Sequence, residues 1–298
     1  LVHQLAEEGN TDIFLPYDAT SLTPEQAAAN PIHLAYPTAM QDKMPTIQCG
    51  EVKTEGVFSV SATTKVAFSS GNLQYQASTN TWRFAEHQYD YVGDANANIS
   101  ATYDGWIDLF GWGTSGFNSK YPYMTSVTNS DYVNGTIDIT HTPYDWGVYN
   151  QIGDDPAGTW RTLTKDEWVY LCNTRPDASN LVGLATVNEV NGLIILPDNW
   201  ALPSGLSFNA LLDFNENIYT PEQWEKMEAA GACFLPAAGY RNSTNVFKVQ
   251  EYGSYWSSSH KNSDKAYNLD FSNSALDPQY SYIRIDGQSV RLVRTIQK

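Results

Sequence analysis

From Gly56 onward the chain is a succession of short strand-like segments separated by Ser, Thr, Gly and Asn, and this pattern limits the fold more than any other feature. The segments 57–60, 65–69, 72–76 and 81–85 follow one another with only short polar turns between them. Apolar runs bounded by turn-forming residues are typical of strands in antiparallel order. The sequence therefore predicts an antiparallel meander at the start of a β- and loop-rich domain.

Two helices are predicted by capping boxes, T-K-D-E from Thr164 and T-P-E-Q from Thr220. After the first box, Trp168, Leu171 and Cys172 recur at helical spacing, which predicts one buried face. Between the helices, the segment 192–196 is predicted to form a buried strand.

The last sixty residues alternate between apolar and polar side chains, notably in 267–271 and 289–293. We therefore expect both helices to pack on one small antiparallel sheet that contains these two strands. The segment 89–150 has many aromatic residues but no regular period, which is typical of long loops held by aromatic side chains.

Residues 1–55 differ in composition and are predicted to form an N-terminal extension or linker, with short helices at 1–8 and from Thr23. Residues 56–298 are predicted to form the main domain. An apolar stretch long enough to span a membrane is absent, and we expect an export signal or a lipid anchor upstream of Leu1.

The chain is acidic, with 17 Lys and Arg against 33 Asp and Glu and a net charge of −16. Such a chain repels nucleic acid, which is excluded as a partner. The five histidines show no metal-binding spacing. We therefore predict no cofactor. The alternative is a calcium ion held by Asp154 and Asp155 or by Asp198 and Asn199.

The three cysteines are too few and too scattered for a disulfide framework. Cys172 and Cys233 lie among apolar neighbours, so we expect free buried thiols, with a bridge between these two as the alternative.

Four motifs carry a resemblance to a known family. They are W-R-T-L-T-K-D-E-W (160–168), F-L-P-A-A-G-Y-R (234–241), Y-W-S-S-S (255–259) and G-Q-S-V-R-L-V-R (287–294). In this order they resemble the C-type-lectin-like domains of the formylglycine-generating-enzyme type, over residues 56–294. The resemblance implies an α+β fold of small antiparallel sheets with two main helices and long irregular loops.

The oxidase members of this family use a pair of cysteines in the C-terminal segment, whereas no cysteine follows Cys233 here. The resemblance therefore implies a protein that is not an enzyme.

A narrower resemblance is to the variable proteins of diversity-generating retroelements, in which Asn codons of this segment change to Tyr, Ser, Ile, Asp or His. That set supplies most of the predicted ligand-binding residues, while Trp256, Val290 and Leu292 are predicted to be scaffold. The predicted ligand-binding residues are His260, Asn262, Asp264, Tyr267, Asn268, Asp270, Tyr280, Tyr282, Arg284 and Asp286.

Alternation predicts that Tyr280, Tyr282, Arg284 and Asp286 share one face of a strand, either as a tyrosine-rich binding surface or as an ordinary solvated face. The favoured function is that of an adhesin- or receptor-like binding protein, extracellular or on the outer cell surface, whose partner is a protein or glycan on a cell surface. The alternatives are a carbohydrate-binding or carbohydrate-active protein and a structural subunit of a surface appendage.

Overall fold

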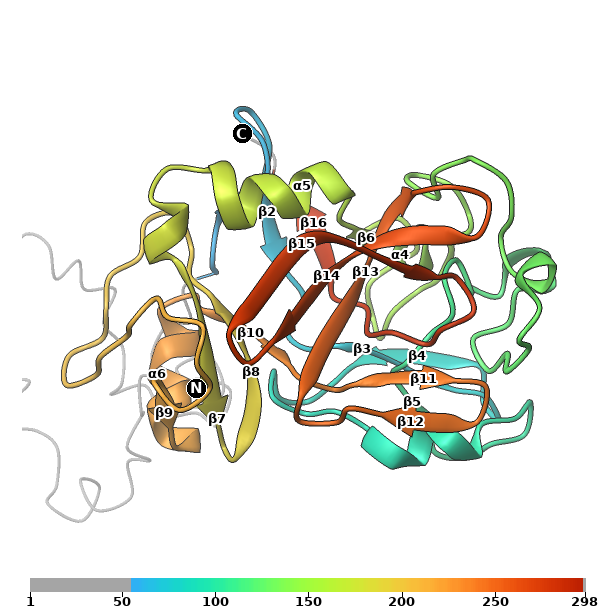
Figure 1. The fold of residues 1–298 in the computed structure, drawn as a ribbon, viewed down its shortest axis with the longest axis horizontal. Coiled ribbons are helices and arrows are strands. Elements are labelled where there is room, and N and C mark those ends of the chain that lie inside the picture. The colour runs from blue at the N-terminus through green and yellow to red at the C-terminus, as the bar shows by residue number, and fades with distance from the viewer. Residues whose placement is uncertain (1–54, 297–298) are drawn as a thin grey trace, which may run out of the picture. The chain divides into compact units, whose positions relative to one another are not determined.

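The computed structural model describes residues 55–296, which form a mixed α+β unit of small, mainly antiparallel sheets (Figure 1). The predicted class is confirmed at this level. The predictions for 1–8 and for the helix from Thr23 lie outside the described residues. Within residues 55–296, no helix has the length and apolar character needed to cross a bilayer.

The elements are short, as the frequent turn residues predict. The strands are β1 (Phe58–Ser59), β2 (Lys65–Phe68), β3 (Leu73–Gln76), β4 (Thr81–Phe84), β5 (Trp106–Ile107), β6 (Arg161–Thr162), β7 (Val182–Val187), β8 (Val190–Ile195), β9 (Ile218–Tyr219), β10 (Cys233–Pro236), β11 (Tyr240–Asn242), β12 (Asn245–Phe247), β13 (Tyr252–His260), β14 (Lys265–Ser272), β15 (Ala275–Ile283) and β16 (Leu292–Thr295). The helices are α4 (Trp146–Tyr149), α5 (Lys165–Val169) and α6 (Pro221–Ala229), with the π turn η7 (Tyr170–Thr174) and the 3-10 turns η4 (Gly93–Asn98), η5 (Phe117–Ser119), η6 (Asn129–Asp131) and η8 (Ala178–Asn180).

Both predicted capping boxes are confirmed. The Thr164 hydroxyl accepts from the Glu167 amide at 3.2 Å, and the Glu167 carboxylate accepts from the Thr164 amide at 2.9 Å. Thr220 and Gln223 make the same reciprocal pair at the start of α6. These contacts satisfy amide groups that have no partner inside the helix, which fixes where each helix begins.

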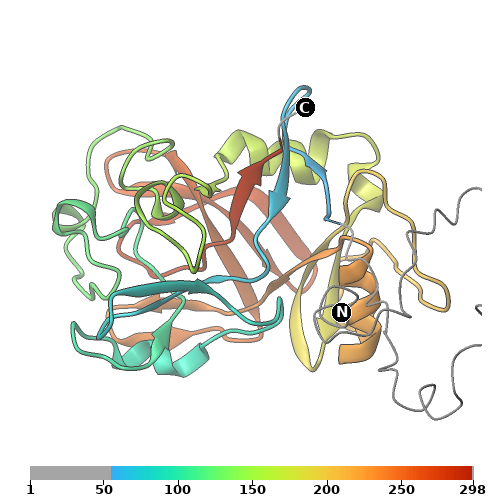
Figure 2. The ribbon, with the colours of Figure 1, turned by 180° about the vertical axis from the view of Figure 1, so that it is seen from behind.

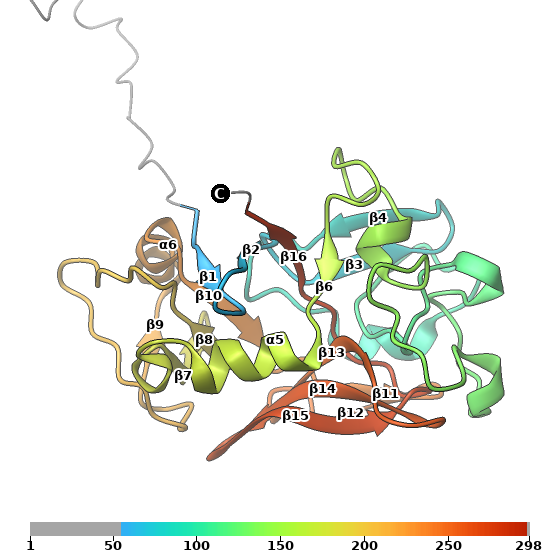
Figure 3. The ribbon, with the colours of Figure 1, turned by 90° about the horizontal axis from the view of Figure 1, so that it is seen from above.

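The sheet of β13, β14 and β15 carries the predicted binding segment, and α5 lies against one of its faces (Figure 3). On that face Tyr255, Leu269 and Phe271 share a buried cluster with Trp168 of α5. The predicted strand 192–196 is confirmed as β8, in the sheet β10-β8-β7-β9, where Trp224 of α6 joins the core.

The predicted meander is wrong in one respect. β1 and β2 form one hairpin and β3 and β4 another, but the two belong to different sheets, in the orders β1-β2-β16-β6 and β4-β3-β5. Strand β16 lies beside β2, so that the two ends of the described chain meet (Figure 2). The chain before β16 separates the hairpins, because the Leu73 amide donates to the Val290 carbonyl at 2.9 Å.

The prediction of a single sheet that contains 267–271 and 289–293 is also wrong. The first segment lies in β14 and the second enters β16, in another sheet of the same unit. Two backbone bonds join β13 to the chain just before β16. The Trp256 amide donates to the Ser289 carbonyl at 3.1 Å, and the Ser289 amide donates to the Ser254 carbonyl at 3.0 Å. Trp256, Val290 and Leu292 are fully buried, as predicted for scaffold residues.

The segment 89–150 consists mainly of irregular loops, as predicted, and buried tryptophans hold them in place. The Trp112 indole donates to the Ser257 carbonyl at 2.8 Å, and the Trp146 indole donates to the Thr114 carbonyl at 3.1 Å. These bonds satisfy the only polar group of each ring, which allows the indoles to lie in the core.

Candidate functional site

Four aromatic rings form a connected array on the hairpin β11–β12 and the edge strand β15. We call Tyr240, Phe247, Tyr280 and Tyr282 the tyrosine face. Tyr240 stacks on Phe247 with ring centroids 5.5 Å apart and on Tyr282 at 5.8 Å, and Tyr282 meets Tyr280 edge to face at 5.3 Å. Both arrangements are favoured geometries for aromatic pairs.

Strand pairing explains why these rings meet. Tyr240 and Phe247 are direct cross-strand partners, so their side chains share one face of the hairpin. Tyr282 pairs with Ala266 of β14, whose small side chain leaves room for the phenol ring. Tyr280 lies two residues away, on the same face of β15.

The two outer rings of the tyrosine face remain open to solvent. Tyr280 is 45% exposed and Phe247 is 44% exposed, while Tyr240 and Tyr282 are half-buried. Burial, with the nearby Asp270, raises the pKa of Tyr282 well above its usual range. The Tyr282 hydroxyl therefore stays protonated and able to donate a hydrogen bond at any physiological pH.

A β-bulge places two aspartates beside the tyrosines. In β15, Asp277 pairs with Asp270 and Tyr280 pairs with Asn268, so two residues of β15 lie opposite Leu269. Residues three apart, such as Asp277 and Tyr280, would point to opposite faces of a regular strand. The bulge brings them to one face, and Pro278 occupies the irregular position where a missing amide is tolerated.

Asp270 is the more buried of the two aspartates. Its carboxylate accepts from the Ser254 hydroxyl at 2.7 Å. Burial, with the negative charge of Asp277, raises the pKa of Asp270 to about 6. Asp270 therefore carries its charge at neutral pH in surroundings that disfavour it.

Three of the predicted binding residues are buried, and the prediction that Arg284 and Asp286 lie on an exposed strand face is wrong. Arg284, Asn268 and Asp286 are at most 4% exposed. Strand β15 ends at Ile283, so the alternation that placed Arg284 and Asp286 beside the tyrosines does not continue. Arg284 instead donates to the carbonyls of Val133, Gly135 and Asn262, and thereby fixes the loops around it.

Asp286 lies below the tyrosine face. Its carboxylate accepts from the Asn242 amide at 2.7 Å, and Arg241 is close enough to favour its charge. Burial, the larger influence, raises the pKa of Asp286. Asp286 therefore links β11 to the end of β15 and is a supporting residue of the face.

The other predicted residues lie at two further places. Tyr267 is on the α5 side of the sheet, with the Lys165 and Lys261 ammonium groups 5.6 and 5.5 Å from its ring centroid. His260, Asn262 and Asp264 lie at the β13–β14 turn. There the Asn262 side chain accepts from the amides of Asp264 and Lys265, and the His260 ring lies 2.6 Å from the Asp138 carboxylate.

Sequence reasoning missed Tyr240, Phe247 and Asp277. The segment 240–247 holds apolar and polar residues on both sides of a Ser-Thr turn, which is a hairpin signal. No pattern in the sequence indicates that Asp277 belongs to the site, because only the bulge places it beside Asp270.

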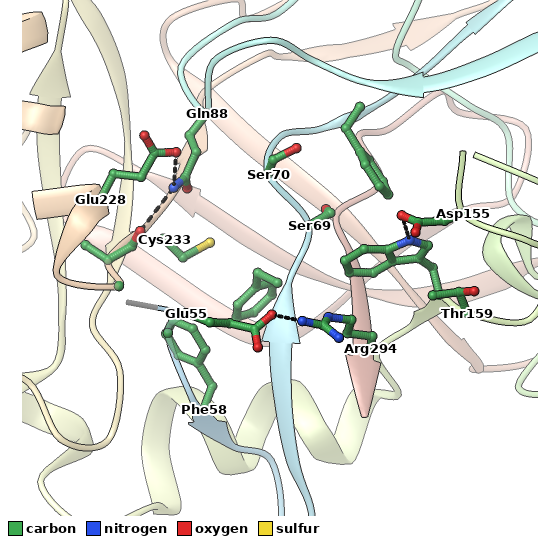
Figure 4. A pocket seen from close by; sticks show the side chains of 16 residues that line it. Glu55, Phe58, Ser69, Ser70, Gln88, Asp155, Thr159, Glu228, Cys233 and Arg294 are labelled. Atoms are coloured by element: carbon green, nitrogen blue, oxygen red, sulfur yellow. Dashed lines mark hydrogen bonds and ion pairs between the residues drawn. The ribbon is translucent and has the colours of Figure 1, made fainter. Parts of the chain in front are cut away.

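A cavity lies away from the tyrosine face, and none of the four rings lines it. It has a volume of about 590 Å³ and aromatic walls, and an ion pair between Glu55 and Arg294 crosses its edge (Figure 4). The Gln88 amide reaches the Glu228 carboxylate at 3.0 Å on the opposite side. Cys233 also lines this cavity.

The thiols of Cys172 and Cys233 are free and buried, and the predicted free state is confirmed. Burial raises the pKa of Cys172 to about 12 and that of Cys233 to about 11. Both groups are therefore protonated at neutral pH, which is the less nucleophilic form. In residues 55–296 no group of three or more His, Cys, Asp and Glu side chains is arranged to hold a metal ion.

Labelling with a thiol reagent tests this arrangement. In a Cys49→Ser background, Cys172 and Cys233 are expected to resist the reagent in the native protein at pH 8 and to react within minutes in 6 M guanidinium, because unfolding exposes them. The measurement is the number of thiols titrated per chain over time. Fast labelling of Cys233 in the native state would contradict its burial beside the cavity.

A family described as Domain of unknown function (DUF8237) matches residues 214–293. No curated protein and no solved structure matches the chain. The matched part runs from the residues before α6 into β16. The part of the chain that is similar to this family thus includes the whole tyrosine face and both of its aspartates.

Proposed function

We propose that residues 56–298 form a C-type-lectin-like domain of the formylglycine-generating-enzyme type, and that this domain is a secreted or surface-displayed binding protein that performs no chemistry. The tyrosine face is its binding surface, and a protein or glycan on a cell surface is its ligand. The observation that carries the proposal is a connected array of rings, held by paired strands, in which Tyr280 and Phe247 are nearly half exposed.

The chemistry of the face supports binding. Tyrosine offers a large contact area with few rotatable bonds, together with a hydroxyl group for hydrogen bonding. Placing such rings on strands keeps them in position before the ligand arrives, which reduces the entropy lost on binding. Trp256 lies fully buried beneath, and its indole donates to the Phe110 carbonyl at 2.7 Å.

We propose that the diversification seen in retroelement variable proteins applies here to the exposed positions only. Asn262, Asp264 and Tyr280 are exposed, whereas Asn268 and Asp286 are buried, where exchange of side chains is costly. A second, adenine-rich copy of the coding sequence for this segment, next to a reverse transcriptase gene, is the expected genomic sign of diversification.

A second candidate function, carbohydrate binding, is favoured by a hollow of about 370 Å³. Amide side chains dominate its wall, among them Asn191, Asn215 and Gln250, and Tyr252 supplies a ring. Amides both donate and accept hydrogen bonds, as pairs of sugar hydroxyls require. Asn191 and Gln250 already bond to Thr186, Tyr91 and one another, so Asn215 and Asn273 are the amides offered to a sugar. Tyr252 pairs with Ser272 on the same face of the sheet as Asp270, so a chain-like ligand would pass from this hollow to the tyrosine face.

The double substitution Tyr280→Ala and Phe247→Ala tests the proposed surface. We expect the fluorescently labelled variant to bind about tenfold or more weakly to cells that the parent protein binds, because aromatic side chains contribute most of the energy of an interface. The melting temperature should change little, since surface substitutions usually alter stability by about 0.5 kcal/mol or less. Flow cytometry and thermal melting measure the two quantities, and protease treatment of the cells or a glycan array separates protein from glycan ligands.

Tyr149→Ala is the matched control. Tyr149 is 46% exposed and meets Phe117 edge to face, much as Tyr280 meets Tyr282, but it lies in α4. Binding that falls equally in this variant, or that survives loss of both rings of the tyrosine face, would remove the site from this surface.

A further inference from the structure

Asp270 and Asp277 form a like-charged pair directly across two neighbouring strands. Facing carboxylates destabilise a sheet, and here the charge of Asp277 makes that of Asp270 harder to maintain. A strand pair selected only for stability would replace one of the two.

The charge of this pair is not neutralised within the described chain. The ion pairs found among residues 55–296 do not include Asp270 or Asp277. Lys265 lies two residues from Tyr267 in β14, which places its side chain on the α5 side of the sheet. Lys261 donates to Ser281 on that side, and Arg284 binds backbone carbonyls. Within residues 55–296, no ion pair therefore supplies a positive charge at this place.

A buried acceptor beside the pair is a second observation that favours a hydrogen-bond donor supplied by a ligand. Asn268 is fully buried, and its Oδ1 atom accepts no hydrogen bond from the described residues. Its Nδ2 atom donates to the Leu269 carbonyl at 3.3 Å. Asn268 lies two residues from Asp270, on the same face of β14, and pairs across the strands with Tyr280. The carboxylate of Asp270 and the free oxygen of Asn268 thus form an acceptor-rich spot next to the rings.

The aromatic rings of Tyr280 and Tyr282 add a second attraction for a positively charged group. Tyr282 is near enough to Asp270 for the carboxylate to raise the pKa of its phenol. Aromatic faces attract ammonium and guanidinium groups, and the attraction is stronger beside a carboxylate that is partly withdrawn from water.

We infer that this spot is a subsite for a basic side chain, an arginine or lysine, presented by a protein partner. The guanidinium or ammonium group lies between Asp270 and Asp277, donates to their carboxylates and to Asn268, and rests against Tyr282 and Tyr280. This inference rests on the proposed function and names the partner's contribution to it. Calcium fits less well, because it takes six to eight oxygen ligands and the aromatic rings supply none.

Short peptides test the subsite. The probes are acetyl-Gly-Arg-Gly-amide, its lysine analogue, and its uncharged citrulline analogue, added to the folded protein in buffer without calcium. We expect the arginine and lysine peptides to shift the ring signals of Tyr280 and Tyr282 in a saturable NMR titration, and the citrulline peptide to leave them unchanged. Asp270→Asn should weaken binding of the charged peptides about tenfold or more, and Asp277→Asn less, because Asp277 is exposed.

Asp154→Asn is the matched control, since Asp154 is an exposed aspartate away from the face and its loss changes the net charge equally. Equal binding of the citrulline peptide, equal loss in Asp154→Asn, unchanged binding in Asp270→Asn, or binding that appears only with added calcium chloride would each overturn the subsite. Cell binding that is lost with Tyr280 and Phe247 but unaffected by Asp270→Asn would overturn the subsite alone and leave the tyrosine face as the binding surface.

Discussion

Replacing Arg291 with methionine is expected to lower the free energy of unfolding by about 3–5 kcal/mol, or to prevent folding altogether. Arg291 is 1% exposed, and its guanidinium group donates to oxygen atoms in three separate parts of the chain. Those bonds reach Asn72 Oδ1 at 3.1 Å, the Ser69 carbonyl at 3.1 Å, the Gln88 carbonyl at 3.3 Å and the Phe234 carbonyl at 2.6 Å.

Methionine fills a similar volume but donates no hydrogen bond. The substitution would leave these buried acceptors without a partner, and each such loss costs about 1–3 kcal/mol. Because Arg291 ties the β2–β3 connection to β10, we expect loss of cooperative unfolding as well as a lower melting temperature. Guanidinium denaturation followed by tryptophan fluorescence measures both effects.

Arg294→Met provides the control within the same motif. The side chain of Arg294 is 47% exposed and pairs with Glu55, whose side chain is 49% exposed. Exposed ion pairs contribute about 0–1 kcal/mol, so this variant should melt close to the parent. Equal destabilisation by the two substitutions would mean that Arg291 does not hold the core together.

This pair of arginines shows what local sequence can and cannot predict. Arginines in an acidic chain commonly pair with Asp or Glu, and Arg294 does so with Glu55, whereas Arg291 pairs with no acidic side chain among residues 55–296. Distance along the chain explains the difference, because the partners of Arg291 lie from 57 to 222 residues away and are mostly backbone oxygens. Backbone acceptors leave no signal in the sequence.

The elements that were predicted correctly depend on neighbouring residues. The capping boxes at Thr164 and Thr220 act within four residues, and so the starts of α5 and α6 followed from the sequence. Sheet membership depends on which distant strands pair. Nothing near β2 indicates that β16 will lie beside it, which is why the meander was predicted as one sheet.

The binding face was predicted in part for the same reason. Alternation placed Tyr280 and Tyr282 on one face, and their rings do meet. Alternation then failed at Arg284, where the chain leaves the sheet after Ile283, and it missed Asp277, which the bulge at Pro278 turns toward Asp270. The end of a strand and a bulge each depend on a single residue, and an alternating pattern of apolar and polar residues does not reveal them.

Replacing Asp270 with asparagine is expected to stabilise the protein at pH 7.5 by about 1–3 kcal/mol. The pKa of Asp270 is raised from its ordinary value to about 6, first by burial and then by Asp277. The folded state therefore binds a proton more tightly than the unfolded state, and the parent loses stability as the pH rises from about 4 through about 6. Asparagine removes the charge while keeping an oxygen that accepts from Ser254.

The pH dependence distinguishes this cause from a general gain in packing. At pH 4 the carboxyl group is protonated in the folded state and about half protonated in the unfolded state, so parent and variant should melt at nearly the same temperature. The difference should grow through pH 5 and 6 and be constant above pH 7. Other buried carboxyl groups, such as Asp108 and Asp145, also titrate near pH 6, but they are common to both proteins and cancel in the difference.

Asp277→Asn serves as the comparison, because it removes only the neighbouring charge and should stabilise by a smaller amount with the same pH trend. Thermal melting of the three proteins between pH 4 and 8 gives the result. The Asp270 charge does not destabilise the folded state if the Asp270→Asn variant is less stable than the parent at pH 7.5. The same conclusion follows if the variant gains as much stability at pH 4 as at pH 7.5. If Asp270→Asn is more stable than the parent but binds the arginine and lysine peptides more weakly, then the Asp270 carboxylate destabilises the fold and serves ligand binding.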